Sequence, residues 1–288
     1  MTVLGAGRGP SLLGAVTLSL DDMQCLLETL ALDDMPVVLD AVGRYDTAAE
    51  HDRAMAAAAA GLADRDLLVD DEVHPELAER LRVLNRPHWE VAARWYVGAS
   101  IHRLCLAKGD DIEVIALRGP DSYVIDQVGH DLPGTVMAAL GPAEPLELAG
   151  MNAPTADLVP IFDDTGDAAT TAERLARVGD PPRDAATLAA ALVQVHSYAE
   201  IVAVVHGDGT RDVTPDHIAV FNTRHGRFLA TASLAADGVK WTALSTGTPA
   251  RFRAALGHLM ADLPLRVEFA PIGQPDSPCR NPVAGSGG

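Results

Sequence analysis

Two stretches of this sequence follow one pattern, and they read Pro133-Gly-Thr-Val-Met-Ala-Ala-Leu-Gly141 and Pro249-Ala-Arg-Phe-Arg-Ala-Ala-Leu-Gly257. Both fit P-x4-A-A-L-G. Each is predicted to be a helix that begins at its proline, because the first turn of a helix does not need the N–H that proline lacks. We interpret the match as the end of an internal repeat, so the segments in front of the two stretches should also match.

Four short strands are predicted in front of the first stretch. They cover residues 90–97, 101–107, 112–117 and 122–128, which are β-branched or aromatic-containing runs. Gly-Ala-Ser, Lys-Gly-Asp and Gly-Pro-Asp turns separate them. Turns this short cannot hold the crossover helices of a parallel sheet, so we expect an antiparallel meander.

Helices are predicted before these strands. Ser19 and Asp22 form a capping pattern in front of apolar residues at helical spacing, and Thr47 with Glu50 repeats it before an alanine-rich helix that ends near residue 62. Pro75 starts a third helix, which Pro87 stops. The first ninety residues are therefore expected to be mainly helical.

The second half is expected to run through the same order after a linker at about residues 142–166. Two helices are predicted at residues 168–178 and 185–195, and strands at 199–205, 217–221, 227–232 and 239–244. Thr248 caps the last helix. In the last strand, alternation places Val239 and Trp241 on one face and Lys240 and Thr242 on the other.

The predicted fold class is α+β, with a quasi-twofold internal repeat and a central antiparallel β-sheet flanked by helical bundles. The expected division is a flexible N-terminus at residues 1–15, an N-terminal α+β half at 16–145, a C-terminal α+β half of the same domain at 146–269 and a disordered tail at 270–288. The tail is rich in Pro, Gly and Ser and has no periodicity.

Charge and composition exclude several classes of function. The net charge of −18 would repel phosphate backbones and anionic lipid, so neither nucleic-acid binding nor membrane insertion is expected. No apolar run reaches membrane-spanning length, and the N-terminus lacks the order of a signal peptide, so we expect a cytoplasmic protein. The three cysteines, Cys25, Cys105 and Cys279, lie far apart and form no CxxC pair. We therefore expect reduced thiols rather than a disulfide framework or a zinc site.

No catalytic motif stands out, and no catalytic residue, metal or cofactor is predicted. Gly5-Ala-Gly7-Arg-Gly9 lacks the preceding strand and following βαβ unit of a dinucleotide site. One alternative stays open, in which the chain is a small α+β enzyme or ligand-sensing module. It would use a C-terminal histidine cluster, namely His196, His206, His217 and His225.

The chain resembles a known family at the C-terminal meander. The residues concerned are Ser197-Tyr-Ala-Glu-Ile-Val-Ala203, Asn222-Thr-Arg-His-Gly-Arg227, Gly247-Thr-Pro249 and the closing Leu263-Pro264. Leu84-Asn-Arg-Pro87 and Leu140-Gly-Pro-Ala-Glu-Pro145 extend the likeness into the N-terminal half. Together they resemble the EspG family of ESX (type VII) secretion-associated proteins.

The resemblance implies a cytosolic chaperone of actinobacterial type, without catalysis or cofactor. Such a chaperone binds a PE/PPE heterodimer, or a related helical-hairpin substrate, covers the apolar tip of the PPE hairpin and keeps the substrate soluble for secretion. The free protein could instead pair with a second copy of itself. The family fold is a quasi-twofold sheet flanked by helical bundles.

The resemblance implies that one face of the sheet, its loops and the C-terminal helical region contact the partner, which on this sequence points to the surface around residues 95–100 and to the last hairpin at 240–242. The predicted partner-binding residues are Trp95, Tyr96, Gly98, Ser100, Lys240, Trp241 and Thr242. Some relatives have a long insertion after the first strand, where this chain has only Val97-Gly-Ala-Ser100, so its contacts with the client are expected to be reduced or different.

Overall fold

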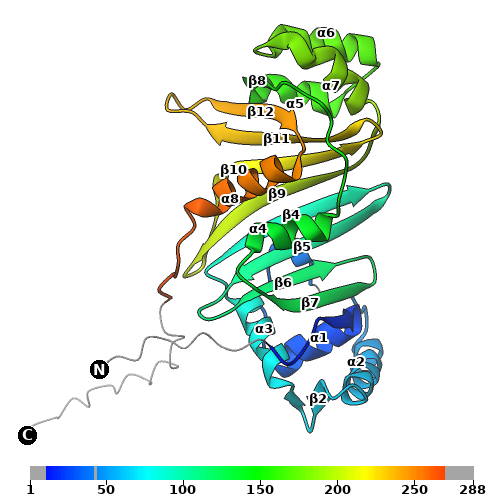
Figure 1. Ribbon diagram of the computed structural model, residues 1–288. Helices are drawn as coiled ribbons and strands as arrows, with labels where there is room; N and C mark the ends of the chain where they lie inside the picture. Colours follow the sequence, from blue (N-terminus) through cyan, green and yellow to red (C-terminus); the bar gives the residue numbers. More distant parts are fainter. Residues whose placement is uncertain (1–10, 42–43, 270–288) are drawn as a thin grey trace, which may run out of the picture.

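One large antiparallel sheet organises the molecule, for which the computed structural model describes residues 11–41 and 44–269 (Figure 1). The strand order is β1-β7-β6-β5-β4-β9-β10-β11-β12-β8. The strands are β1 (Val16–Ser19), β4 (Trp89–Val97), β5 (Ser100–Lys108), β6 (Glu113–Arg118), β7 (Ser122–Val128), β8 (Met151–Pro154), β9 (Val195–Gly207), β10 (Thr210–Thr223), β11 (Gly226–Leu234) and β12 (Lys240–Thr246). A separate small hairpin pairs β2 (Leu68–Val69) with β3 (Glu72–Val73).

The helices are α1 (Leu20–Thr29), α2 (Ala48–Ala63), α3 (Pro75–Asn85), α4 (Leu132–Leu140), α5 (Thr155–Asp163), α6 (Ala168–Val178), α7 (Ala185–Leu192) and α8 (Pro249–Ala261), with two 3₁₀ turns, η1 (Val37–Leu39) and η2 (Pro182–Asp184). Apart from these turns and the small hairpin, each half runs strand, three helices, four strands, helix. The halves meet where β4 pairs with β9. The α+β class and the antiparallel sheet are confirmed, whereas the sequence repeat stays a prediction.

The predicted helix starts are confirmed in atomic detail. Ser19 Oγ accepts from the Asp22 N–H at 3.0 Å, and Asp22 Oδ2 accepts from the Ser19 N–H at 2.9 Å, which completes a capping box. Thr47 caps α2 and Thr248 caps α8 through the hydroxyl alone, which accepts from the N–H of Glu50 and of Arg251, respectively. These local signals were readable because each depends on residues within one turn of the chain.

The predicted linker at residues 142–166 is wrong, because it contains β8 and α5. Neither element is easily predicted from the sequence, because β8 is only four residues long and α5 contains Pro160, which normally ends a helix. Strands β9 and β10 also extend well beyond their predicted bounds. A bulge between Val213 and His217 interrupts the pairing of β10 with β9. Because a bulge breaks the alternation of apolar and polar residues along a strand, the sequence pattern did not predict one long strand there.

The two faces of the sheet are covered differently. Helices α4 and α8 cross the middle of one face (Figure 1), where Phe252 and Leu256 pack on strand residues such as Val91 and Ile201. On the opposite face, α1–α3 cover the N-terminal end and α5–α7 the C-terminal end. This opposite face is hereafter called the open face. Its centre carries the exposed side chains of Arg94 and Glu200.

The chain before β1 is fastened to α3. The fully buried Arg80 donates through Nη1 to the Gly14 carbonyl at 2.9 Å and through Nη2 to Ser11 Oγ at 2.9 Å. Glu76 accepts from Ser11 and from the Leu13 N–H, and these hydrogen bonds lower the pKa of Glu76 to about 2. Residues 1–10 of the predicted flexible N-terminus and the whole predicted tail at 270–288 lie outside the described residues, as do Gly5–Gly9 and Cys279.

Candidate partner-binding face

A groove of about 590 Å³ lies on the open face, between α5 and the C-terminal strands. Its walls are mostly apolar and include Leu158, Val159 and Phe162 from α5, Leu192 from α7, and Tyr198 and Phe221 from the sheet. Val159 is 47% exposed although it is apolar. Pockets of this size with apolar walls are typical of binding sites.

A row of aromatic rings continues from this groove across the sheet. Tyr96 stacks on Tyr198 with ring centroids 4.5 Å apart, Tyr198 lies 6.1 Å from Phe221, and Phe221 stacks on Phe228 at 4.7 Å. Phe162 of α5 approaches Phe221 at 5.6 Å. Partial burial, followed by the nearby charge of Glu200, raises the pKa of the Tyr198 hydroxyl above its ordinary value of 10.0.

Strand register builds this row. Tyr96 is directly opposite Tyr198, Tyr198 is opposite Phe221, and Phe221 is opposite Phe228. Residues that lie directly opposite one another in antiparallel strands point to the same side of the sheet, so four strands deliver one ring each to one face. Phe228 is fully buried, while Tyr96, Tyr198 and Phe221 are half-buried. The row is therefore anchored at one end and accessible at the other.

The predicted residues of the β4–β5 hairpin divide between the two faces. Trp95 packs on the α4/α8 side, with its ring 5.6 Å from that of His102, whereas Tyr96 joins the aromatic row. Gly98 has a φ of +58° and turns the hairpin, and Ser100 is exposed beside it.

The predicted residues of β12 divide in the same way. Trp241 is exposed on the α4/α8 side of the sheet, whereas alternation places Lys240 on the same face as Thr242. Thr242 is buried in the groove wall, where its hydroxyl lies 2.8 Å from that of Thr155. The seven residues thus do not form one patch, and only Tyr96 and Thr242 belong to the groove and its aromatic row.

The C-terminal histidines stay apart from one another. His206 is buried, with Nε2 3.8 Å from Glu90 Oε1, and His225 contacts Gln194 through Nε2 at 3.1 Å. His217 lines the groove, and burial lowers its pKa, whereas His196 is exposed. Within residues 11–41 and 44–269, no three His, Cys, Asp or Glu side chains form a group that could hold a metal ion. The convergence required by the histidine alternative is therefore not found.

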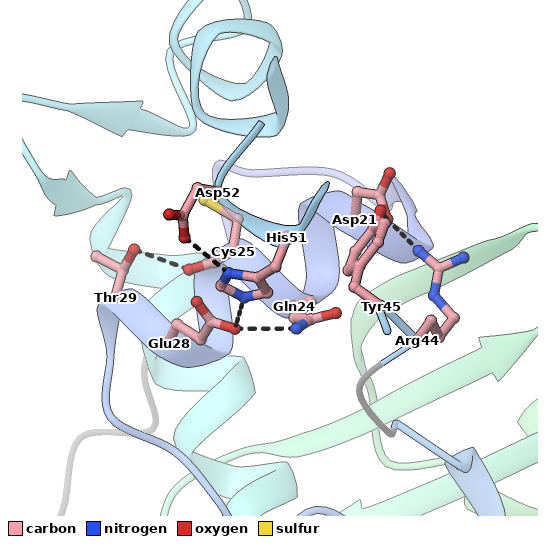
Figure 2. A network of polar contacts seen from close by, with 9 residues as sticks. All are labelled: Asp21, Gln24, Cys25, Glu28, Thr29, Arg44, Tyr45, His51 and Asp52. Atoms are coloured by element: carbon pink, nitrogen blue, oxygen red, sulfur yellow. Dashed lines mark hydrogen bonds and ion pairs between the residues drawn. The ribbon is translucent and has the colours of Figure 1, made fainter. Parts of the chain in front are cut away.

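A polar network in the N-terminal half joins α1 to α2 (Figure 2). His51 contacts Glu28 at 2.8 Å through Nε2 and Asp52 at 3.2 Å through Nδ1, and these hydrogen bonds raise the pKa of His51. Partial burial opposes ionisation of Glu28, but the hydrogen bonds from His51 and Gln24 leave its pKa below the usual value. Burial raises the pKa of the Cys25 thiol. Since the thiol stays protonated, the network fastens two helices rather than activating a nucleophile.

Phe162, Tyr198 and Phe221 were missed as site residues. Phe162 lies three residues after Val159, and this i, i+3 spacing of apolar residues signals a helix inside the predicted linker. For Tyr198 and Phe221, alternation along each strand would have predicted which neighbouring side chains point to the same face of the sheet. Their meeting depends on the register between β9 and β10, which no local pattern reveals.

Comparison with known proteins agrees with this architecture. The chain is 29% identical over 199 residues to the ESX-1 secretion-associated protein EspG1 of Mycobacterium tuberculosis, covering 67% of each chain. It is 26% identical over 256 residues to the ESX-3 secretion-associated protein EspG3 of Mycolicibacterium smegmatis, covering 87% of each.

Its fold is similar to that of the type VII secretion system chaperone EspG5 of Mycobacterium tuberculosis, whose structure was solved in complex with a PE25–PPE41 dimer. The TM-score is 0.70 at 17% identity, over 87% of this chain and 97% of that one. The model of the EspG family matches residues 19–258, which is well over half of the sequence. The chain therefore belongs to the EspG family.

Proposed function

We propose that this chain is a cytoplasmic secretion chaperone that binds a PE/PPE heterodimer. It covers the apolar tip of the PPE helical hairpin and keeps the pair soluble for type VII (ESX) secretion. Membership of the EspG family supports this role, and so does the likeness in fold to a chaperone that was solved with a PE/PPE dimer. The observation that carries the proposal is the apolar groove, because an exposed apolar surface of this kind suits an apolar protein segment.

The proposed contact surface is the α5 groove together with the aromatic row. Phe162, Tyr198 and Phe221 supply half-buried rings, and aromatic side chains add a large apolar area to an interface. Tyr96 extends the row toward the β4–β5 hairpin, where Gly98 and Ser100 border the surface. Trp95 and Trp241 face the opposite side of the sheet, so they serve as comparison sites rather than as the centre of the interface.

We propose further that this role involves binding without catalysis. The relatives named above are described as secretion-associated proteins and as a chaperone, which supports this reading. Across residues 11–41 and 44–269, no helix has both the length and the apolar character needed to cross a membrane.

The test is co-expression with each PE/PPE pair from the same genome, followed by size-exclusion chromatography with light scattering. A complex containing one copy of each chain, with the PPE protein remaining in solution, is the expected result. The mass of the chain run alone shows whether two copies pair in the absence of a client. If the folded chain binds none of the pairs, the proposed client class is wrong.

A matched pair of variants then locates the surface. Val159→Asp places a charge in the groove, while Val69→Asp makes the same change at a residue of similar exposure on β2, at the other end of the molecule. Only Val159→Asp is expected to abolish the complex. Equal binding by both variants would remove the groove from the proposal.

A further inference from the structure

Three arginines lie side by side on the open face. Arg94 of β4 is directly opposite Arg103 of β5, and Arg103 is directly opposite Arg118 of β6. Cross-strand partners share a face, and this face also carries Cys105 and Ala116, which pack under α1–α3. The three guanidinium groups therefore form a row across the sheet, hereafter the arginine row.

The arginine row is unfavourable for the sheet on its own, because like charges directly opposite one another destabilise strand pairing. Two carboxylates face it. Asp40 Oδ2 lies 2.5 Å from Arg118 and 3.3 Å from Arg103, and the hydrogen bond from Arg118 lowers the pKa of Asp40. Glu200 is opposite Arg94 in register. Three positive charges thus meet two negative ones in a chain whose net charge is −18.

The three arginines differ in what holds them. Arg118 is largely buried and lies 5.7 Å from the Tyr123 ring centroid, and it shares Asp40 with Arg103. These contacts give Arg118 a structural role. Arg94 is exposed, and among the described residues no carboxylate lies within ion-pair distance of it. Asp40, whose pKa the charge of Arg94 helps to lower, and Glu200 thus act on Arg94 from beyond ion-pair distance, and its side chain stays exposed.

The arginine row and the aromatic row meet at β4, from which the arginine row crosses β5 and β6 and the aromatic row crosses β9, β10 and β11. Arg94 and Tyr96 are two residues apart on β4 and point to the same face, so the ends of the two rows are neighbours there. A partner that lays an apolar segment on the rings brings its neighbouring residues over Arg94 and Arg103. Since the chain as a whole repels acidic proteins, a local row of cations would select both the position and the direction of such a segment.

We propose that the arginine row binds side-chain carboxylates of the client, in an acidic segment next to the apolar tip that enters the groove. Arg94 makes the principal contact, with Arg103 beside it, and a guanidinium group can hold a carboxylate through two parallel hydrogen bonds. This inference rests on the proposed function and adds to it the chemistry of the client.

The test uses the PE/PPE pair that forms a complex with the chain on co-expression. Its dissociation constant is measured for the wild type, Arg94→Gln and Arg53→Gln at NaCl concentrations from about 0.05 to 0.5 M, a range over which screening of exposed charges becomes strong. Arg53 is an exposed residue of α2, outside the three strands that carry the arginine row, so Arg53→Gln makes the same change in net charge without altering that row. Thermal unfolding of each variant verifies that it is folded.

Arg94→Gln is expected to raise the dissociation constant about tenfold at low salt and to reduce its salt dependence, with little effect at high salt. Arg53→Gln should behave as the wild type. In a second arm, Arg94→Glu is combined with clients whose acidic residues are replaced by Lys one at a time, and one replacement should restore binding.

If Arg94→Gln binds with the wild-type dissociation constant and salt dependence, the inference is overturned while the chaperone function stands. The same holds if no Lys replacement rescues Arg94→Glu. If the wild-type chain binds no PE/PPE pair, the proposed function fails, and this inference fails with it.

Discussion

The strand–helix pairs β1–α1 and β8–α5 occupy corresponding places in the two halves, yet they pack differently. Helix α1 buries Met23, Leu26 and Leu27 against the N-terminal sheet, and the cavity beside it measures about 180 Å³. Helix α5 leaves Val159 exposed and Phe162 half-buried above a groove of about 590 Å³. One order of elements therefore gives a closed core at one end of the sheet and an open apolar surface at the other.

The difference has a local cause in α5. Pro160 lies inside this nine-residue helix, where it removes one backbone hydrogen bond. Arg174 of α6 donates to the carbonyls of Pro160 and Asp164, each at 2.6 Å, and so holds the end of α5 from outside. By contrast, α1 begins with a complete capping box and is fastened to α2 by His51. Helix α5 also begins without a side-chain cap, so the helix above the groove has weaker local support at its start than α1.

The largest expected effect is a loss of stability when a cavity is made in the closely packed N-terminal half. Leu26→Ala removes a fully buried side chain of α1 and should lower the free energy of unfolding by about 2–5 kcal/mol, because a cavity is left in a close-packed core. Chemical denaturation measures this loss. Below the unfolding transition, the variant should still bind the client with wild-type affinity, and weaker binding by the folded variant would contradict the division of roles between the halves.

The reciprocal change is made in the open half. Phe162→Ala should cost the complex at least about 2 kcal/mol, or roughly a thirtyfold rise in the dissociation constant, as is typical of an aromatic hot spot. Its effect on unfolding should be smaller than that of Leu26→Ala, since Phe162 is only half-buried. Isothermal titration with the client and denaturation of the free chain give the two values. A larger loss of stability than of binding would mean that Phe162 is a core residue.

Local sequence signals predicted the helices that begin with caps or prolines and the antiparallel meanders, because these depend on neighbours along the chain. The short strand β8 and the proline-containing α5 were missed, since neither carries such a signal. Trp95 and Trp241 were chosen for their chemistry, but alternation within the strands turns them away from the face that carries Tyr96 and Thr242. The aromatic and arginine rows depend on register across four and three strands, which the sequence does not display.

A larger side chain in the groove tests whether the client enters it, without the loss of any existing contact. Ala219 lines the groove on β10, and Ala219→Leu should weaken client binding about tenfold while changing stability by less than about 1.5 kcal/mol, because the groove has room for the larger side chain. Ala57→Leu on the exposed surface of α2 is the matched control. Titration of both variants measures the effect, and unchanged binding by Ala219→Leu would show that the client does not enter the groove.

The smallest effect concerns the link between α1 and α2. Because contacts with Glu28 and Asp52 raise the pKa of His51 in the folded chain, their stabilisation is present below the ordinary value of 6.5 and is lost as pH rises through the folded value. The difference in melting temperature between the wild type and His51→Gln should therefore be largest near about pH 6 and shrink toward about pH 8.

Client binding adds a second readout to the His51 comparison. If α1 and α2 serve only to close the N-terminal core, His51→Gln alters melting but leaves the dissociation constant unchanged at every pH. A change in affinity that follows the titration of His51 would extend the binding surface into the closed half. The two halves would then differ in how tightly they pack but not in whether they bind, and the groove under α5 would be only part of the interface.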